Sequence, residues 1–239
     1  MGGIGKTTLA LLAYNSDDVK KHFEKRIWVC VSDPFDEFRI ARAIIEALKP
    51  GSAKDLVEFR SLMRHIKECV EGEKFLLVLD DVWNEYYSKW EPFYNYLKNG
   101  LHGSKILITT RKDRVARCMR STKIIPIDLL SEKECWSIFE SLAFFDKSME
   151  GCENFKKIGR EIVGKCKGLP LAVKIIGNLL RSRNTKEEWQ NILKSEIWEL
   201  EGVKIGVLAS LLLSYNELPS KVTLMRKEIM RKETKRWRT

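Results

Sequence analysis

The sequence predicts an α/β fold in its first half, built on a parallel β-sheet, followed by a small all-α domain. Apolar runs of strand length alternate with amphipathic stretches of helical period up to about residue 130, as they do when helices cover a sheet. Beyond that point only helical patterns continue. With 239 residues and 44% hydrophobic content, the chain can bury a sizeable core.

The chain opens with a glycine-rich stretch, Gly2-Gly3-Ile4-Gly5-Lys6-Thr7-Thr8, which has the pattern of a phosphate-binding loop. Its glycines let backbone N–H groups turn inward, Lys6 reaches the β- and γ-phosphates, and Thr7 offers a hydroxyl to Mg²⁺. The helix expected from Lys6 to Tyr14 points its positive end at the anion. The match covers seven of eight positions, because the first glycine of the pattern would precede Met1. A flexible N-terminus leading into an ordinary helix is the alternative.

Three elements are predicted between the first helix, with its polar turn at residues 15–18, and residue 73. A strand at 27–31 is apolar along its length, as a strand buried on both faces would be. Apolar residues at helical spacing then predict helices over 38–48 and 56–70, each of which ends at a glycine-containing dipeptide.

The second informative stretch is an apolar strand at residues 75–79 that ends in Asp80 and Asp81. An open α/β sheet places its ligands at the carboxyl ends of its strands. Asp80 would hold Mg²⁺ through its water shell, and Asp81 would orient or deprotonate an attacking water. A strand that ends in a solvated Asp-Asp turn is the alternative, which the upstream loop disfavours.

A third strand is predicted at residues 105–109, and Arg111 follows it closely. A guanidinium can grip phosphate oxygens bidentately, so Arg111 is a candidate sensor of the terminal phosphate. An ordinary surface arginine is the alternative. A last, short strand is predicted at 124–127, with Pro126 consistent with an edge position.

Only helices are predicted beyond Leu130. Two capping boxes, Ser131 to Glu134 and Thr185 to Glu188, open the first and last of them. Between these, apolar residues at helical spacing run from 155 to 166, and Pro170 stands in the first turn of the next helix.

Composition excludes several classes of protein. There is no apolar run long enough to span a bilayer and no signal-peptide layout, so we expect a soluble, cytoplasmic protein without a membrane segment. The six cysteines form no C-x-x-C pair and the three histidines are scattered, which predicts no metal cluster and reduced thiols.

The net charge of +10 is concentrated at the C-terminus. Residues 221–239 hold eight Lys/Arg and two Glu, a net of +6, which leaves +4 for the other 220 residues. Nucleic-acid binding would therefore depend on this tail alone, and we do not expect it, because so charged a stretch is more often solvated or disordered.

Taken together, the motifs resemble the NB-ARC domain, the nucleotide switch of plant intracellular immune receptors and of related apoptosis regulators. The loop, Leu76 to Trp83, Gly103 to Arg111, and Gly168-Leu169-Pro170-Leu171 occur in the order and approximate spacing of that domain. Residues 28–32 and Trp83 are similar to the subclass that carries an N-terminal coiled coil.

The resemblance covers about residues 1–220 and implies a division of the chain. Residues 1–130 would form the P-loop nucleotide-binding domain, 131–200 the helical ARC domain, and 201–220 the beginning of a winged-helix domain. The basic tail, 221–239, departs from the family pattern. The glycine and strand before the loop are missing, as are the Met-His-Asp motif, the leucine-rich repeats and the coiled coil. We therefore interpret the chain as a receptor fragment truncated at both ends, with its sheet lacking the first strand.

The resemblance also implies roles for individual residues. Phosphate would be bound by the loop, with Lys6, Thr7 and Thr8, while Asp80 serves Mg²⁺, Asp81 supports hydrolysis and Arg111 senses phosphate. Pro170 would pack near the adenine and lock the helical domain onto bound ADP.

Such receptors rest with ADP and become active after exchange for ATP and assembly into oligomers. The implied cofactors are ADP or ATP with Mg²⁺, and the implied partners are other proteins or further copies of the full-length receptor. Hydrolysis would be slow, at most a reset of the switch.

Two other functional classes stay open. A conventional P-loop ATPase or kinase would need a substrate pocket of its own and would show ordinary steady-state turnover. A non-functional truncated receptor fragment would bind no nucleotide.

Overall fold

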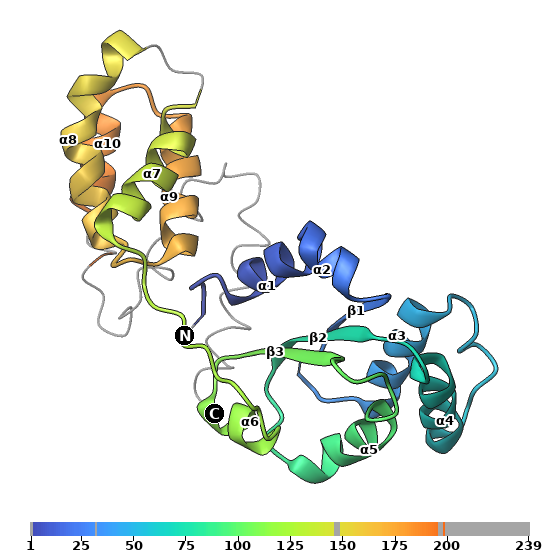
Figure 1. Cartoon of the computed structure of the whole chain (residues 1–239). Coiled ribbons are helices and arrows are strands. Elements are labelled where there is room, and N and C mark those ends of the chain that lie inside the picture. The colour runs from blue at the N-terminus through green and yellow to red at the C-terminus, as the bar shows by residue number, and fades with distance from the viewer. Residues whose placement is uncertain (1, 32, 146–148, 196–197, 199–239) are drawn as a thin grey trace. The chain divides into compact units, whose positions relative to one another are not determined.

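The computed structural model describes residues 2–31, 33–145, 149–195 and 198. These residues belong to two compact units, one on either side of the step from Ile127 to Asp128, and each unit has its own hydrophobic core (Figure 1). The predicted winged-helix segment, 201–220, and the basic tail, 221–239, lie outside the described residues.

The first unit is built on three parallel strands, which confirms the predicted α/β class. They are β1 (Lys25–Cys30), β2 (Phe75–Val82) and β3 (Lys105–Thr110), in the spatial order β1-β2-β3. In the register, Ile27 lies opposite Leu77, and Leu77 lies opposite Ile106. The central strand, β2, is buried along nearly its whole length. Because it lies between β1 and β3, its carboxyl end stands in the middle of one edge of the sheet.

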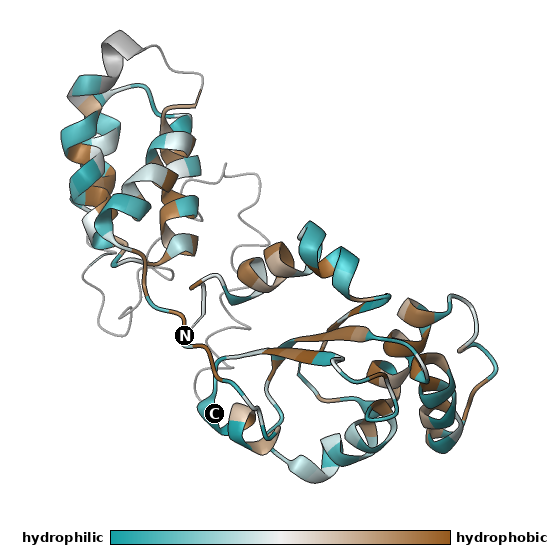
Figure 2. Cartoon of the chain, in the orientation of Figure 1, coloured by the Kyte–Doolittle hydropathy of each residue, from teal (hydrophilic) through white to brown (hydrophobic). Residues whose placement is uncertain are grey.

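Helices cover both faces of this sheet (Figure 1). One face carries α1 (Lys6–Asn15) and α2 (Asp17–His22); the other carries α3 (Glu37–Leu48), α4 (Phe59–Val70) and α5 (Tyr87–Leu97), while α6 (Asp113–Cys118) follows β3. Alternate side chains of β2 enter separate cores, because Leu77 and Leu79 pack with α3 to α5 and Val78 packs with Ala10 of α1. A strand buried on both faces is apolar along most of its length, as β2 is from Phe75 to Leu79 (Figure 2).

The strand predicted at residues 124–127 is wrong. These residues have no strand pairing, and Ile124 and Ile125 are exposed. Together with Ile106 and Leu9 they line a groove of about 770 Å³ along β3. A β-strand is stable only where a neighbour completes its hydrogen-bond ladder, and in the described residues β3 pairs with β2 alone. An apolar run with the right residue types therefore remains irregular here.

The second unit consists of four helices in the part of the chain that the structure describes. They are α7 (Glu132–Ala143), α8 (Met149–Lys165), α9 (Pro170–Arg181) and α10 (Lys186–Leu193). Helix α7 packs beside α9, and α8 beside α10. Phe139 and Trp189 are fully buried in the core between them, with their rings edge to face at 5.9 Å. No helix among the described residues is both long and apolar enough to cross a membrane.

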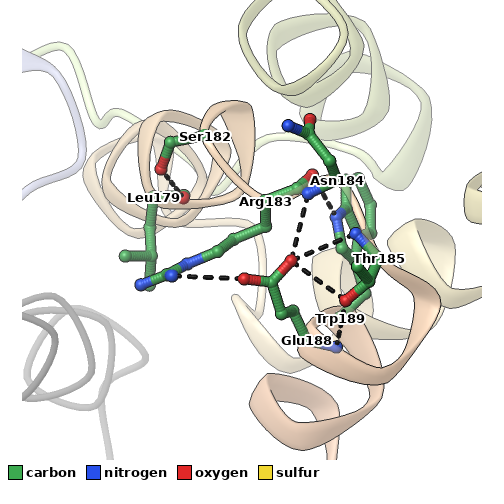
Figure 3. Close-up of polar contacts among 7 residues, drawn as sticks. All are labelled: Leu179, Ser182, Arg183, Asn184, Thr185, Glu188 and Trp189. Atoms are coloured by element: carbon green, nitrogen blue, oxygen red, sulfur yellow. Dashed lines mark hydrogen bonds and ion pairs between the residues drawn. The ribbon is translucent and has the colours of Figure 1, made fainter.

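Both predicted capping boxes are present in this unit. At the start of α10, Thr185 Oγ1 accepts a hydrogen bond from the Glu188 N–H, and the Glu188 carboxylate accepts from the N–H groups of Thr185 and Asn184 (Figure 3). Arg183 Nη1 lies 3.3 Å from the same carboxylate. These bonds, led by those from Thr185, lower the pKa of Glu188 below its usual value.

Candidate functional site

The glycine-rich loop enters α1 without a conventional cap. Gly5 is the N-cap residue, with a φ of +98°, a left-handed conformation that strains any residue with a Cβ. No side chain caps the helix, and the first hydrogen bond of the ladder runs from the Leu9 N–H to the Gly5 carbonyl. Because the N-cap residue is a glycine, no N-cap side chain covers the start of the helix, an arrangement suited to an anion.

A buried carboxylate ties this helix to the sheet. Asp80, near the end of β2, is 5% exposed, and its Oδ1 accepts hydrogen bonds from two hydroxyls. Thr7 Oγ1 on α1 donates at 2.9 Å and Thr109 Oγ1 on β3 donates at 2.6 Å. A buried charge is tolerated only with such donors. Three elements that are far apart in sequence thus meet at one oxygen atom.

The next carboxylate, Asp81, lies in a β-bulge. Leu79 pairs with Ile108 and Val82 pairs with Thr110, so two residues of β2 face Thr109 alone. Asp81 has a φ of +55°, uncommon for a residue other than glycine, and its N–H donates to Thr109 Oγ1 at 2.9 Å. Bulges of this kind re-aim side chains next to functional sites. Here the bulge brings Asp81 within reach of Arg111.

Arg111, just past β3, lies over the same edge. Its Nε is 3.5 Å from Asp81 Oδ1, and its guanidinium lies 5.0 Å from the centroid of the Trp83 ring. A Cβ on Gly2 would lie 2.9 Å from Arg111 Nη1, so the absence of a side chain at position 2 allows the loop and the arginine to approach closely.

Lys6 completes a cluster of two cations and two carboxylates. Burial is the main factor that lowers the pKa of Lys6, and the nearby Arg111 cation lowers it further, against the opposing effect of Asp81 and Asp80. The charged ammonium is thus less favourable here than in water. An anion bound between Lys6 and Arg111 would relieve this cost, which is the electrostatic character of a phosphate site.

The structure brings most of the predicted site residues together. The loop from Gly2 to Thr8, the two carboxylates and Arg111 meet at the carboxyl edge of the sheet. Pro170 is the first residue of α9 in the second unit, and its predicted role stays a prediction. The hydroxyl of Thr7 and the carboxylate of Asp80 are hard oxygen ligands of the type that Mg²⁺ prefers. The donor set therefore fits a phosphate together with its cation.

Thr109 and Trp83 also lie at the site, and the sequence pattern predicts neither role. Thr109 is a polar residue at the end of an apolar run, which is the one signal of its role in the sequence. The contact of Trp83 with Arg111 depends on the folded chain.

Comparison with known proteins supports the same conclusion. Residues 1–149 match the family model described as "NB-ARC domain". This chain belongs to the NB-ARC family. Family membership implies nucleotide binding.

The relatives of this NB-ARC chain are named as disease resistance proteins of plants. It is 39% identical over 219 residues to the putative disease resistance protein RGA1 of Solanum bulbocastanum, and 41% identical over 221 residues to RGA4 of the same species. It is 38% identical over 225 residues to the putative disease resistance RPP13-like protein 1 of Arabidopsis thaliana. Each match covers 92% of this chain but only 21% or 22% of the relative. The chain therefore spans about a fifth of the length of these relatives.

Proposed function

We propose that this chain is the ADP/ATP-binding switch of a plant intracellular immune receptor and acts in defence signalling. The observation that carries the proposal is the convergence of the phosphate loop, Asp80, Asp81 and Arg111 at one edge of the sheet. The names of the relatives support the link to disease resistance. Cytoplasmic location and assembly with other proteins or further receptor copies belong to the same proposal.

The chain's own residues divide the work of binding. The backbone N–H groups at the start of α1 and in the loop of residues 2–5 donate hydrogen bonds to the phosphate oxygens, and the Lys6 ammonium neutralises part of their charge. Thr7 and Asp80, already joined by a 2.9 Å hydrogen bond, would hold Mg²⁺. When bound, Mg²⁺ would neutralise part of the negative charge of the phosphates.

Asp81 and Arg111 distinguish the two nucleotides in this proposal. Their 3.5 Å ion pair gives Arg111 a partner at the sheet edge, and a terminal phosphate competes with Asp81 for the guanidinium. An Asp81 carboxylate released in this way accepts a proton from water, which supports slow hydrolysis. Pro170 would contact the adenine and hold the helical unit on the ADP form.

Identifying the nucleotide that accompanies the purified chain tests the proposal most directly. Denaturing the protein and separating the released nucleotides should yield ADP, and steady-state ATP turnover should be very slow, because a switch retains its product. Rapid multiple turnover would instead favour a conventional P-loop ATPase or kinase. Recovery of no nucleotide, with no affinity for added ADP or ATP, would refute nucleotide switching altogether.

A second experiment separates the two carboxylates. Asp80→Asn should weaken Mg²⁺-dependent ATP binding, because it removes charge from the ligand that meets Thr7. Asp81→Asn should leave binding intact and slow hydrolysis, so that ATP-loaded protein accumulates. Equal losses of ATP affinity in both variants would show that the carboxylates do not divide the work.

A further inference from the structure

Thr109 occupies the one position on β3 that faces both carboxylate residues. Its side chain is 7% exposed, and its Oγ1 donates to Asp80 Oδ1 at 2.6 Å while it accepts from the Asp81 N–H at 2.9 Å. Asp80 and Thr109 are the buried polar residues of the described chain. A single hydroxyl therefore connects the end of β3 to both members of the Asp-Asp pair.

The hydroxyl has little freedom in this arrangement. A threonine hydroxyl carries one proton, and the incoming Asp81 N–H occupies one of its lone pairs, so its proton is directed to Asp80. The bond to a carboxylate is charge-assisted and correspondingly short. The β-branched side chain adds a stiff χ1 rotor, which holds the hydroxyl in place. Thr109 can thus fix the orientation of the Asp80 carboxylate.

The bulge explains why the Asp81 N–H donates to a side chain and not to a backbone carbonyl of β3. At Asp80 and Asp81 the regular ladder between β2 and β3 is interrupted, and the Asp81 N–H turns to the Thr109 side chain for its acceptor. That bond supports the left-handed backbone at Asp81, with its φ of +55°. One residue therefore sets the side chain of Asp80 and the backbone of Asp81.

We infer that Thr109 is a positioning residue for the cation site, an inference that rests on the proposed function. It acts through Asp80: with Thr7 it clamps Oδ1 from two sides, and so presents the carboxylate to Mg²⁺ in one orientation. Its neighbour Thr110 does something different, because its hydroxyl donates to the Val82 carbonyl at 2.7 Å and contacts neither carboxylate. Thr110 is therefore a matched control on the same strand.

The test measures the ATP affinity of the full 239-residue chain with and without Mg²⁺. Thr109→Val keeps the shape and removes the hydroxyl, and it should reduce the gain in affinity that Mg²⁺ provides by about tenfold, the scale of a lost hydrogen bond to a charged group. Affinity without Mg²⁺ should stay within about twofold of wild type. Thr109→Ser should restore the gain, and Thr110→Val should leave it unchanged.

Each result decides between positioning and simple packing. A wild-type Mg²⁺ gain in Thr109→Val, equal losses in Thr109→Val and Thr110→Val, or failure of serine to rescue would overturn the role of the hydroxyl. If Thr109→Val does not fold, as judged by its circular dichroism, Thr109→Ala provides the comparison with serine. A wild-type chain that binds ATP with no Mg²⁺ gain would instead refute the proposed cation site, and this inference with it.

Discussion

The two units differ in the polar residues that they bury. In the α/β unit, Asp80 and Thr109 are buried, Asp81 has a left-handed backbone, and α1 starts without a side-chain cap. In the helical unit, the buried residues that the structure describes are apolar, and side-chain capping boxes satisfy the starts of α7 and α10.

This difference predicts that residues of the two units contribute differently to stability and to function. Buried polar groups and strained backbone reduce stability unless the rest of the fold compensates, and natural sequences keep them mainly where a ligand requires them. In the α/β unit, hydrogen bonds join Thr7 and Thr109 to Asp80 at the edge of the sheet. The core of the helical unit has the features of a stable scaffold, so mutations in that core should affect unfolding and mutations at the sheet edge should affect binding.

The largest effect on stability should come from Phe139→Ala. Phe139 is fully buried in the helical unit, and its ring contacts those of Trp136, Phe144 and Trp189. Removing a buried aromatic ring leaves a cavity and costs about 3 to 5 kcal/mol. Urea unfolding followed by circular dichroism should show the loss as a lower midpoint for the helical unit.

Phe145→Ala is the matched control for that experiment. Phe145 is 54% exposed, and the Arg181 guanidinium lies 4.2 Å from the centroid of its ring. Its loss should cost less than about 1 kcal/mol. Similar midpoints for the two variants would mean that the core does not determine the stability of this unit.

Lys6→Ala should weaken nucleotide binding and leave stability nearly unchanged, the converse of Phe139→Ala. Loss of charged hydrogen bonds to phosphate should weaken ADP binding by about 2 to 3 kcal/mol, roughly 30- to 150-fold in Kd. The fold should barely change, because burial and the nearby Arg111 cation disfavour the charged form of Lys6 and lower its pKa, against the opposing effect of Asp81 and Asp80. Isothermal titration and thermal unfolding measure the two effects. An ADP affinity within about twofold of wild type would contradict the loop assignment.

The pH dependence of binding sharpens this assignment. Because the pKa of Lys6 is lowered from 10.5 in the unbound protein and bound phosphate favours the charged form, ADP affinity should fall as pH rises through the lowered pKa, before pH 10.5 is reached. The unbound chain should gain stability over the same window, since its unfolded state holds the Lys6 proton more tightly. Lys6→Arg stays charged and should have a flatter profile. If the ADP affinity of wild type and of Lys6→Arg falls in the same way with pH, the titrating group is not Lys6.

Local patterns made much of this fold predictable. The loop, the β2 strand with its Asp pair, and both capping boxes are encoded within a few consecutive residues, and the structure contains all of them. The sequence predicts a turn at residues 15–18, but in the structure Ser16 caps α2. The two are easily confused because the same residue types favour turns and helix starts. Helix α5 is not among the helices predicted from sequence, because it contains Pro92, a residue that usually interrupts a helical pattern.

The features that sequence could not predict depend on contacts between distant residues. Thr109 meets Asp80 from 29 positions away, and the bulge at Asp81 exists only because β2 and β3 pair on both sides of it. The error at residues 124–127 has the same origin, since an apolar run becomes a strand only beside a partner. The residue types of the site were thus predictable, and their orientation was not.

Thr185→Ala should have a smaller effect than Phe139→Ala or Lys6→Ala, and it tests the scaffold role of the helical unit. Thr185 Oγ1 accepts from the Glu188 N–H at 3.3 Å and donates to the Glu188 carboxylate at 3.0 Å, so alanine removes the cap of α10. The loss should lower the free energy of unfolding by about 1 kcal/mol. Thr185→Ser retains the cap and should stay close to wild type. ADP affinity should be unchanged in both, because neither alters a side chain at the sheet edge. A cap mutation that weakened ADP binding as strongly as Lys6→Ala would contradict this expectation, because the contact proposed between the helical unit and ADP is made by Pro170 of α9 and not by α10.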